Sequence, residues 1–242
     1  MTNLNKSNLI KIAGAIVILI AIFFVFSTTT QSRGLNAFAE SYASFRDQQY
    51  NTYIYSYVPV VDASSETGEE NYFTYLAKAV DTKQTNSFRK SNAEQALSVY
   101  KSMNQKAMDT FSEHISILDS ATSQLVESAN KIDKDEYRAT ATDITKYARE
   151  IQQNYESLRL KYVKRFNLQI KLLEELVDSG GDIFSLGTTL KDGGTKIPKI
   201  GEEIQSLTEQ TDKNSKKMDD AFFSLKGRAG LKDYPNKFTQ NQ

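Results

Sequence analysis

The chain holds few residues that could perform chemistry, and His114 is the most informative of them. It is the only histidine among the 242 residues, and there is no cysteine. With one histidine, a metal site would need carboxylates as its remaining ligands, and the pair of Glu-x-x-His motifs found in di-iron bundles is ruled out; a serine triad needs a histidine that a serine and an acid can both reach. His114 stands instead between Phe111 and Leu118 at helical spacing, which favours a structural role. The sequence therefore predicts a protein that is not an enzyme and uses no metal or cofactor.

A glycine-rich stretch, residues 179–197, is the next candidate for function. It lacks the G-x-x-x-x-G-K-[ST] spacing with which a loop cradles phosphates. We expect a linker or helix-capping loop between helices, and the alternative is that its apolar side chains Ile183, Phe184 and Leu186 contact a partner.

The densest basic stretch supplies a second candidate contact, through Arg159, Lys164 and Arg165, with Lys161 and Lys171 close by. On a helix these side chains spread over the face opposite the apolar positions, and the simplest interpretation is a solvated surface. The alternative is docking to an acidic protein or to anionic lipid headgroups. Across the chain 30 basic residues balance 30 acidic ones, so nothing favours a nucleic-acid partner.

A small molecule is the other candidate partner, with a pocket between helices near Tyr100, His114 and Tyr155. The chain has 13 tyrosines, whose rings pack in a core while their hydroxyls bind polar groups. Such a ligand-sensing bundle would need a separate signalling partner, because no apolar segment after Phe26 is long enough to return through a membrane.

Two long helices must position these candidates. Apolar residues recur at alternating steps of three and four over residues 92–132, and again over residues 134–178. This is the heptad pattern of a coiled-coil seam, and the short break between the two stretches predicts an antiparallel hairpin.

Three local signals set the expected ends of these helices. Ser91 with Glu94, and Asp133 with Glu136, have the spacing of capping boxes. Gly180 suits a helix C-terminus.

The flanking segments complete the predicted all-α fold. We expect a tyrosine-rich, membrane-proximal helix over residues 29–61, although residues 50–58 also fit a strand. An acidic loop over 62–71, a last helix over 198–226 with Pro198 in its first turn, and a tail over 227–242 follow. Because one partner cannot bury a wide apolar stripe, these helices should complete a coiled-coil-like bundle of three or four helices, unless identical chains provide the cover.

The N-terminal segment predicts a membrane anchor. Residues 9–28 are predominantly apolar with Lys11 as their one charged residue, and about 20 such residues span a bilayer as one transmembrane helix. Lys6 and Lys11 place residues 1–8 in the cytoplasm by the positive-inside rule, and residues 72–226 outside it or in the periplasm. A cleaved signal peptide and a pilin-like filament subunit are the alternatives.

These observations favour a function in binding. We expect a single-pass, signal-anchored scaffold or interaction protein of the plasma membrane, held by lipid contacts of residues 9–28. It would self-associate, or serve as a subunit of a larger membrane or cell-envelope assembly.

Overall fold

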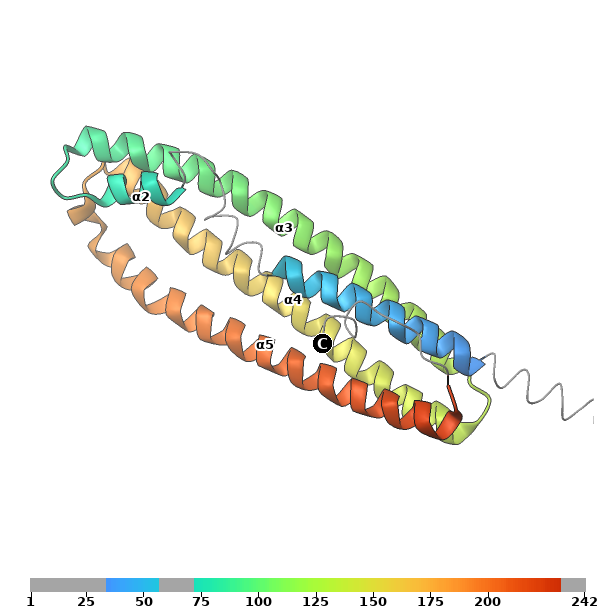
Figure 1. Cartoon of the computed structure of the whole chain (residues 1–242). Coiled ribbons are helices and arrows are strands. Elements are labelled where there is room, and N and C mark those ends of the chain that lie inside the picture. The colour runs from blue at the N-terminus through green and yellow to red at the C-terminus, as the bar shows by residue number, and fades with distance from the viewer. Residues whose placement is uncertain (1–33, 57–71, 232–242) are drawn as a thin grey trace, which may run out of the picture.

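Two helices of nearly equal length, α3 (Asn86–Asn130) and α4 (Asp135–Asp178), form the predicted antiparallel hairpin. The computed structural model describes residues 34–56 and 72–231, and within these ranges it contains helices and no strand. The helices lie side by side and make an elongated bundle (Figure 1). The all-α bundle expected from the sequence is thus confirmed.

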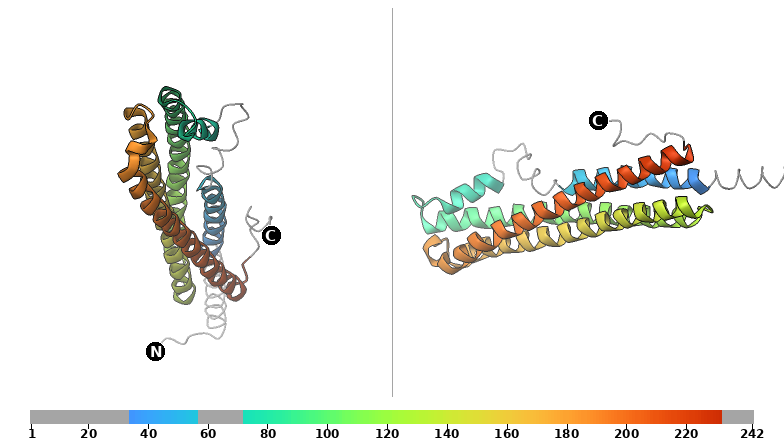
Figure 2. Two further views of the ribbon diagram at one scale, coloured as in Figure 1. Left: turned by 90° about the vertical axis from the view of Figure 1, so that its left-hand side faces the viewer. Right: turned by 90° about the horizontal axis from the view of Figure 1, so that it is seen from below.

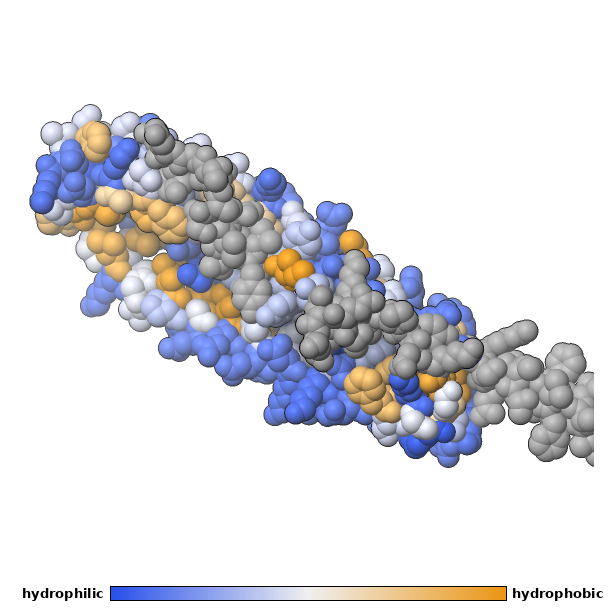
Figure 3. Space-filling view, in the orientation of Figure 1, coloured by the Kyte–Doolittle hydropathy of each residue, from blue (hydrophilic) through white to orange (hydrophobic). Residues whose placement is uncertain are grey.

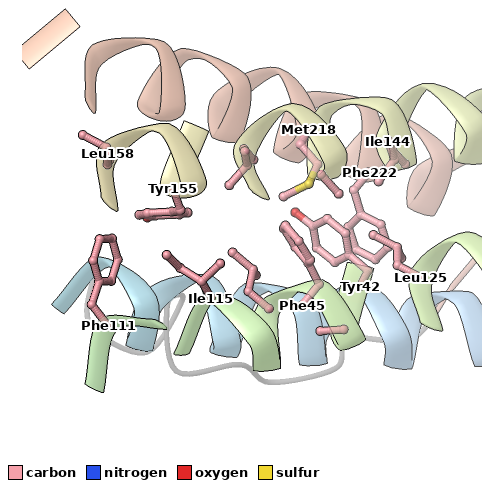
Figure 4. Close-up of a cluster of buried hydrophobic side chains, with 14 of the residues drawn as sticks. Tyr42, Phe45, Phe111, Ile115, Leu125, Ile144, Tyr155, Leu158, Met218 and Phe222 are labelled. Atoms are coloured by element: carbon pink, nitrogen blue, oxygen red, sulfur yellow. The ribbon is translucent and has the colours of Figure 1, made fainter. Parts of the chain in front are cut away.

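Most of the heptad seam is buried as predicted, although some members, such as His114, are only half-buried. Its fully or largely buried members are Tyr100, Asn104, Ala107, Phe111, Leu118, Ala121, Leu125, Ser128 and Ile132 on one side, and Ala141, Ile144, Ala148, Ile151, Tyr155, Leu158, Tyr162, Phe166 and Leu173 on the other. The ring of Phe111 meets that of Tyr155 edge to face, with centroids 6.4 Å apart. Figure 4 shows such side chains from several helices pointing toward one another.

Two consecutive shorter helices cover the side of α3 that α4 does not contact. The helix of residues 34–56 and then α2 (Tyr72–Val80) follow each other along α3, antiparallel to it (Figures 1 and 2). The Thr52 hydroxyl donates to the His114 carbonyl at 3.3 Å, and the ring of Tyr72 stacks on that of Tyr100 at 4.7 Å.

Helix 34–56 buries one face, on which Leu35, Phe38, Tyr42 and Phe45 recur at steps of three and four residues. Within residues 50–58, the described positions, up to 56, are helical, so the strand alternative is wrong there.

The last helix, α5 (Gly187–Ala229), is much longer than predicted. The expected loop over 179–197 is wrong beyond residue 182, because a short 3-10 helix, η1 (Ile183–Leu186), leads directly into α5. Gly193 is buried, and a Cβ there would lie 2.9 Å from Leu172 Cδ1, so this glycine permits the close approach of α5 to α4. Pro198 lies well inside the helix instead of in its first turn.

The predicted capping boxes are also wrong. Thr85 is the N-cap of α3, and its hydroxyl accepts a hydrogen bond from the Phe88 amide at 3.3 Å, so Ser91 lies inside the helix. At the start of α4 the N-cap is Lys134, with no side-chain cap, and the Arg138 guanidinium donates to the Ile132 carbonyl in the turn before the helix.

Glycines do end α4, as expected. Gly180 and Gly181 follow its last turn with φ of 71° and 87°. A Cβ on Gly181 would also collide with the backbone of Asn86, which brings the start of α3 against this turn.

The bundle therefore has two different ends. At the hairpin end, where α3 turns into α4, a Cβ on Gly34 would lie 2.7 Å from the Lys131 carbonyl oxygen, so helix 34–56 begins there. At the η1 end, the α2–α3 turn meets residues 179–186.

None of the helices in the described ranges combines the length and apolarity needed to cross a bilayer. The predicted anchor over 9–28, residues 1–8 and the acidic loop over 62–71 lie outside those ranges. The predicted tail over 227–242 is helical up to Ala229, and residues 232–242 are not described.

Candidate functional site

The most polar part of the core lies between helix 34–56 and α5. The Arg46 side chain is only 2% exposed, and its Nη2 lies 3.0 Å from Asp219 Oδ2. The Tyr42 hydroxyl donates to the other carboxylate oxygen, Asp219 Oδ1. One carboxylate on α5 is therefore held by two donors that stand one helical turn apart on helix 34–56.

The network continues along both helices. Arg46 Nη1 donates to Gln49 Oε1, and Gln49 Nε2 donates to Ser215 Oγ. On its other side, the ring of Tyr42 stacks on that of Phe222 with centroids 3.7 Å apart. Side chains over about two turns of each helix thus join helix 34–56 to α5.

Burial controls the protonation of this network. Burial raises the pKa of the Asp219 carboxyl, while the charge of Arg46 and the hydrogen bond from Tyr42 lower it. Burial also raises the pKa of the Tyr42 hydroxyl, and the Asp219 charge raises it further, so the hydroxyl stays protonated as a donor. These groups satisfy one another, as expected of a structural lock between helices.

A cavity of about 520 Å³ opens beside this lock, within the usual size of small-molecule sites. Its lining combines three tyrosine rings with acidic and basic groups: Arg46, Gln49, Tyr50, Tyr53, Tyr155, Asp212, Ser215, Lys216, Asp219 and Asp220. Among the three residues of the predicted ligand pocket, only Tyr155 belongs to this lining.

The structure does not bring the other two predicted pocket residues to the cavity. Tyr100 is buried near α2, where its hydroxyl donates to Gln169 and burial raises its pKa. The His114 ring stacks on that of Tyr55 at 3.9 Å, and desolvation lowers its pKa. Its Nδ1 is buried and has no hydrogen-bond partner among the described residues.

The predicted apolar contact near residue 184 is only partly available. Leu186 is buried at 6% exposure in a small cluster with Ala79, Ala93 and Leu176, and Ile183 packs partly buried against it. Phe184 is 78% exposed and is the most accessible of the three to a partner.

Three other apolar side chains at the η1 end are exposed to solvent and were not predicted as partner contacts. Val80 is 48% exposed at the end of α2, Phe88 41% at the start of α3, and Leu190 50% at the start of α5. The apolar tip is the name used below for these three residues together with Phe184. Figure 3 shows apolar patches interrupting the hydrophilic surface at this end.

The three predicted basic contacts do not share one surface. Arg159 Nε is paired with Glu156 at 3.2 Å. The charge of Arg165 lies near Tyr100, whereas Lys164 is exposed and lines a groove between α4 and α5.

In residues 34–56 and 72–231, no group of three or more His, Asp or Glu side chains is placed to hold a metal ion. Among known proteins, no family model matches the chain, and neither a curated protein nor a solved structure matches it.

Proposed function

We propose that this chain is a membrane-anchored helical scaffold that holds its bundle outside the cytoplasmic membrane and presents the apolar tip to a protein partner or to further copies of itself. The observation that carries the proposal is the buried contact of Arg46 with Asp219. It fixes helix 34–56, which follows the apolar segment 9–28 closely in the sequence, to the rest of the bundle.

A flexible stalk between an anchor and a domain would need no buried ion pair. Breaking such a pair costs about 3–5 kcal/mol, because one charge is left without its partner. Residues 29–33 are all that separate segment 9–28 from helix 34–56. A scaffold gains from this arrangement, because its bundle keeps one orientation relative to its anchor.

The two ends of the bundle then have different environments. Helix 34–56 begins at the hairpin end, so this end faces the bilayer and the η1 end points away from it. The 44 residues of α4 place the apolar tip about 65 Å farther out, at 1.5 Å per residue. Exposed Phe and Leu side chains in such a position fit a contact with another protein.

Membrane anchoring is tested by fractionation of cells that express the full chain. The proposal expects the chain to stay with the membranes after alkaline carbonate extraction, and added protease to reach the bundle from outside. Release into the soluble fraction, or protection from external protease, would contradict it.

Assembly is tested by cross-linking in membranes, with a tip variant and a matched control. We expect Phe184→Ser together with Phe88→Ser to reduce the cross-linked species, because both remove apolar tip surface. The control is Ile117→Ser, which alters a side chain of 39% exposure on α3 away from the tip. A chain that stays monomeric without cross-linked partners, or equal loss in the control, would refute the role of the tip.

The cavity beside the lock favours one second candidate, a ligand-sensing bundle. A pocket of about 520 Å³ with tyrosine rings and both charge signs suits a small zwitterionic or polar aromatic molecule. A thermal-shift screen of amino acids and organic acids tests it, with Tyr155→Leu as the variant that should abolish any shift. A screen without a hit would leave the scaffold as the remaining proposal.

A further inference from the structure

A groove between α4 and α5 combines basic side chains from both helices. Its volume is about 750 Å³, and its lining includes Lys164 and Lys171 from α4 and Lys196 and Lys199 from α5. The sequence showed only the α4 half of this arrangement. These four residues define the lysine groove.

The lysine groove carries a surplus of positive charge. Glu203 is the one acid in its lining, and it is already paired with Lys161 at 2.7 Å. The hydrogen bond from Lys161 lowers the pKa of Glu203, and the nearby charges of Lys164 and Lys199 lower it further. Neither Lys164 nor Lys199 forms an ion pair with any described residue.

The other two lysines are only partly neutralised. Lys196 pairs with Asp192 at 2.7 Å, and Lys171 lies 3.7 Å from Glu175. Both pairs are exposed to solvent, where such contacts contribute little and exchange readily.

The same groove has an apolar lining between its charges. Val163 and Leu168 from α4 and Ile200 from α5 contribute to it, and Leu160 leaves 58% of its surface exposed there. A purely polar anion would gain nothing from these side chains, whereas an acyl chain would bury them.

We propose that the lysine groove binds a free single-chain anionic amphiphile, such as a medium- or long-chain fatty acid. The acid head would lie among Lys164, Lys196 and Lys199, and the acyl chain would cover the apolar lining beside Leu160. The volume supports this occupant, because small-molecule sites measure about 300–1,000 Å³, whereas a stable protein contact usually needs a larger and flatter surface.

The proposed orientation of the scaffold selects a free amphiphile over a bilayer lipid, and in this respect the inference rests on the proposed function. Lys164 lies about eight helical turns, or roughly 45 Å, from Asp135 at the hairpin end. This exceeds the screening length of about 8 Å at physiological salt several times over, so headgroups in the bilayer lie out of reach.

Lysine footprinting of the full chain in phosphatidylcholine nanodiscs tests the inference. Decanoate is the probe, N-hydroxysuccinimidyl acetate modifies the lysines, and mass spectrometry measures the rate at each site. At twice its dissociation constant, decanoate should slow acetylation of Lys164 and Lys199 about threefold. Lys106, exposed on α3 outside the groove, should react at an unchanged rate.

Two variants separate the head from the tail. The double variant Lys164→Gln with Lys199→Gln should weaken decanoate binding roughly tenfold, because two charge contacts are lost. Its affinity is measured from the protection of Lys171 and Lys196 against acetylation. Leu160→Ser should weaken it about threefold through lost apolar contact. The control variant Lys106→Gln should bind as the unaltered chain does.

Each other result overturns the inference in a distinct way. Equal protection by inorganic phosphate would make the groove a site for polar anions, and equal protection by decanol would remove the need for charge. Protection by phosphatidylglycerol nanodiscs without decanoate would show a bilayer lipid as the source and contradict the proposed orientation. No protection at all would overturn the groove site and leave the scaffold proposal standing.

Discussion

Replacing Arg46 with methionine removes the cation of the lock while keeping a long side chain in its place. The Arg46 side chain is 2% exposed and that of Asp219 is 23% exposed, so the variant leaves a largely buried carboxylate without its counter-ion. Removing one partner of a buried pair costs about 3–5 kcal/mol. We expect a loss of about 3 kcal/mol at neutral pH, at the lower end of this range, because Tyr42 still donates to the carboxylate.

The loss should depend on pH with a definite sign. Burial raises the pKa of Asp219 and Arg46 lowers it, so the Arg46→Met variant has the higher Asp219 pKa. A carboxyl whose pKa is raised by folding contributes stability that is present below its unfolded value of about 3.9 and is lost as pH rises through the folded value. The deficit of the variant relative to the unaltered chain should therefore be small in acid and largest at neutral pH.

Urea unfolding of the full chain in a mild detergent, followed by circular dichroism, measures both effects. The matched control is Arg149→Met, an exposed arginine on α4 whose loss should change the free energy of unfolding by less than about 0.5 kcal/mol. The double variant Arg46→Met with Asp219→Leu should recover most of the lost stability, because neither charge is then buried alone. A deficit for Arg46→Met no larger than the control, or one that does not change with pH, would refute the lock.

Four further variants test other parts of the fold. Gly201→Ala, with open space around it, should raise the free energy of unfolding by about 0.5–1 kcal/mol, and Gly193→Ala should raise it less, because its Cβ would lie 2.9 Å from Leu172 Cδ1 and that side chain must move. Pro198→Ala should stabilise the chain by up to about 3 kcal/mol, since it restores a helical N–H donor inside α5; an unchanged urea midpoint would contradict this. Desolvation lowers the pKa of His114 in the folded chain, so the stability contributed by the neutral imidazole is present above a pH of about 6.5 and is lost as the pH falls. When the free energy of unfolding is measured in weak acid and at neutral pH, His114→Gln should therefore lose less stability on acidification than the unaltered chain does.

The hairpin was predictable because heptad spacing can be recognised in the sequence alone. Phe111, Leu118 and Leu125 stand at steps of seven residues, and the burial of that stripe follows from periodicity alone. Local capping signals were weaker guides, since Ser91 has the form of a cap yet lies inside α3, while Thr85 caps the helix.

The lock could not be predicted from local patterns, because Arg46 and Asp219 are 173 residues apart in the chain. A charged residue normally indicates a solvated face. One signal did exist, because Tyr42 and Arg46 continue the apolar stripe of Phe38 and Phe45 at helical spacing.

The lysine groove was not predicted, because two glycines in α5 indicated a loop. Gly193 and Gly194 suggested a loop, which placed Lys196 outside any helix and left the basic residues of α4 without a facing partner. A glycine that permits close helix packing and a glycine in a loop look alike in one sequence, because their difference lies in what a Cβ would meet.

The most direct test of the lock is the distance between helix 34–56 and α5 in the full chain within a bilayer. Cysteines introduced at the exposed positions Glu40 and Asp220 can carry spin labels without interference, because the chain has no cysteine of its own. We predict a single narrow distance distribution by pulsed electron paramagnetic resonance, and a broader one after Arg46→Met. A broad distribution in the unaltered chain would mean that helix 34–56 moves independently of the bundle, and it would contradict a scaffold fixed on its anchor.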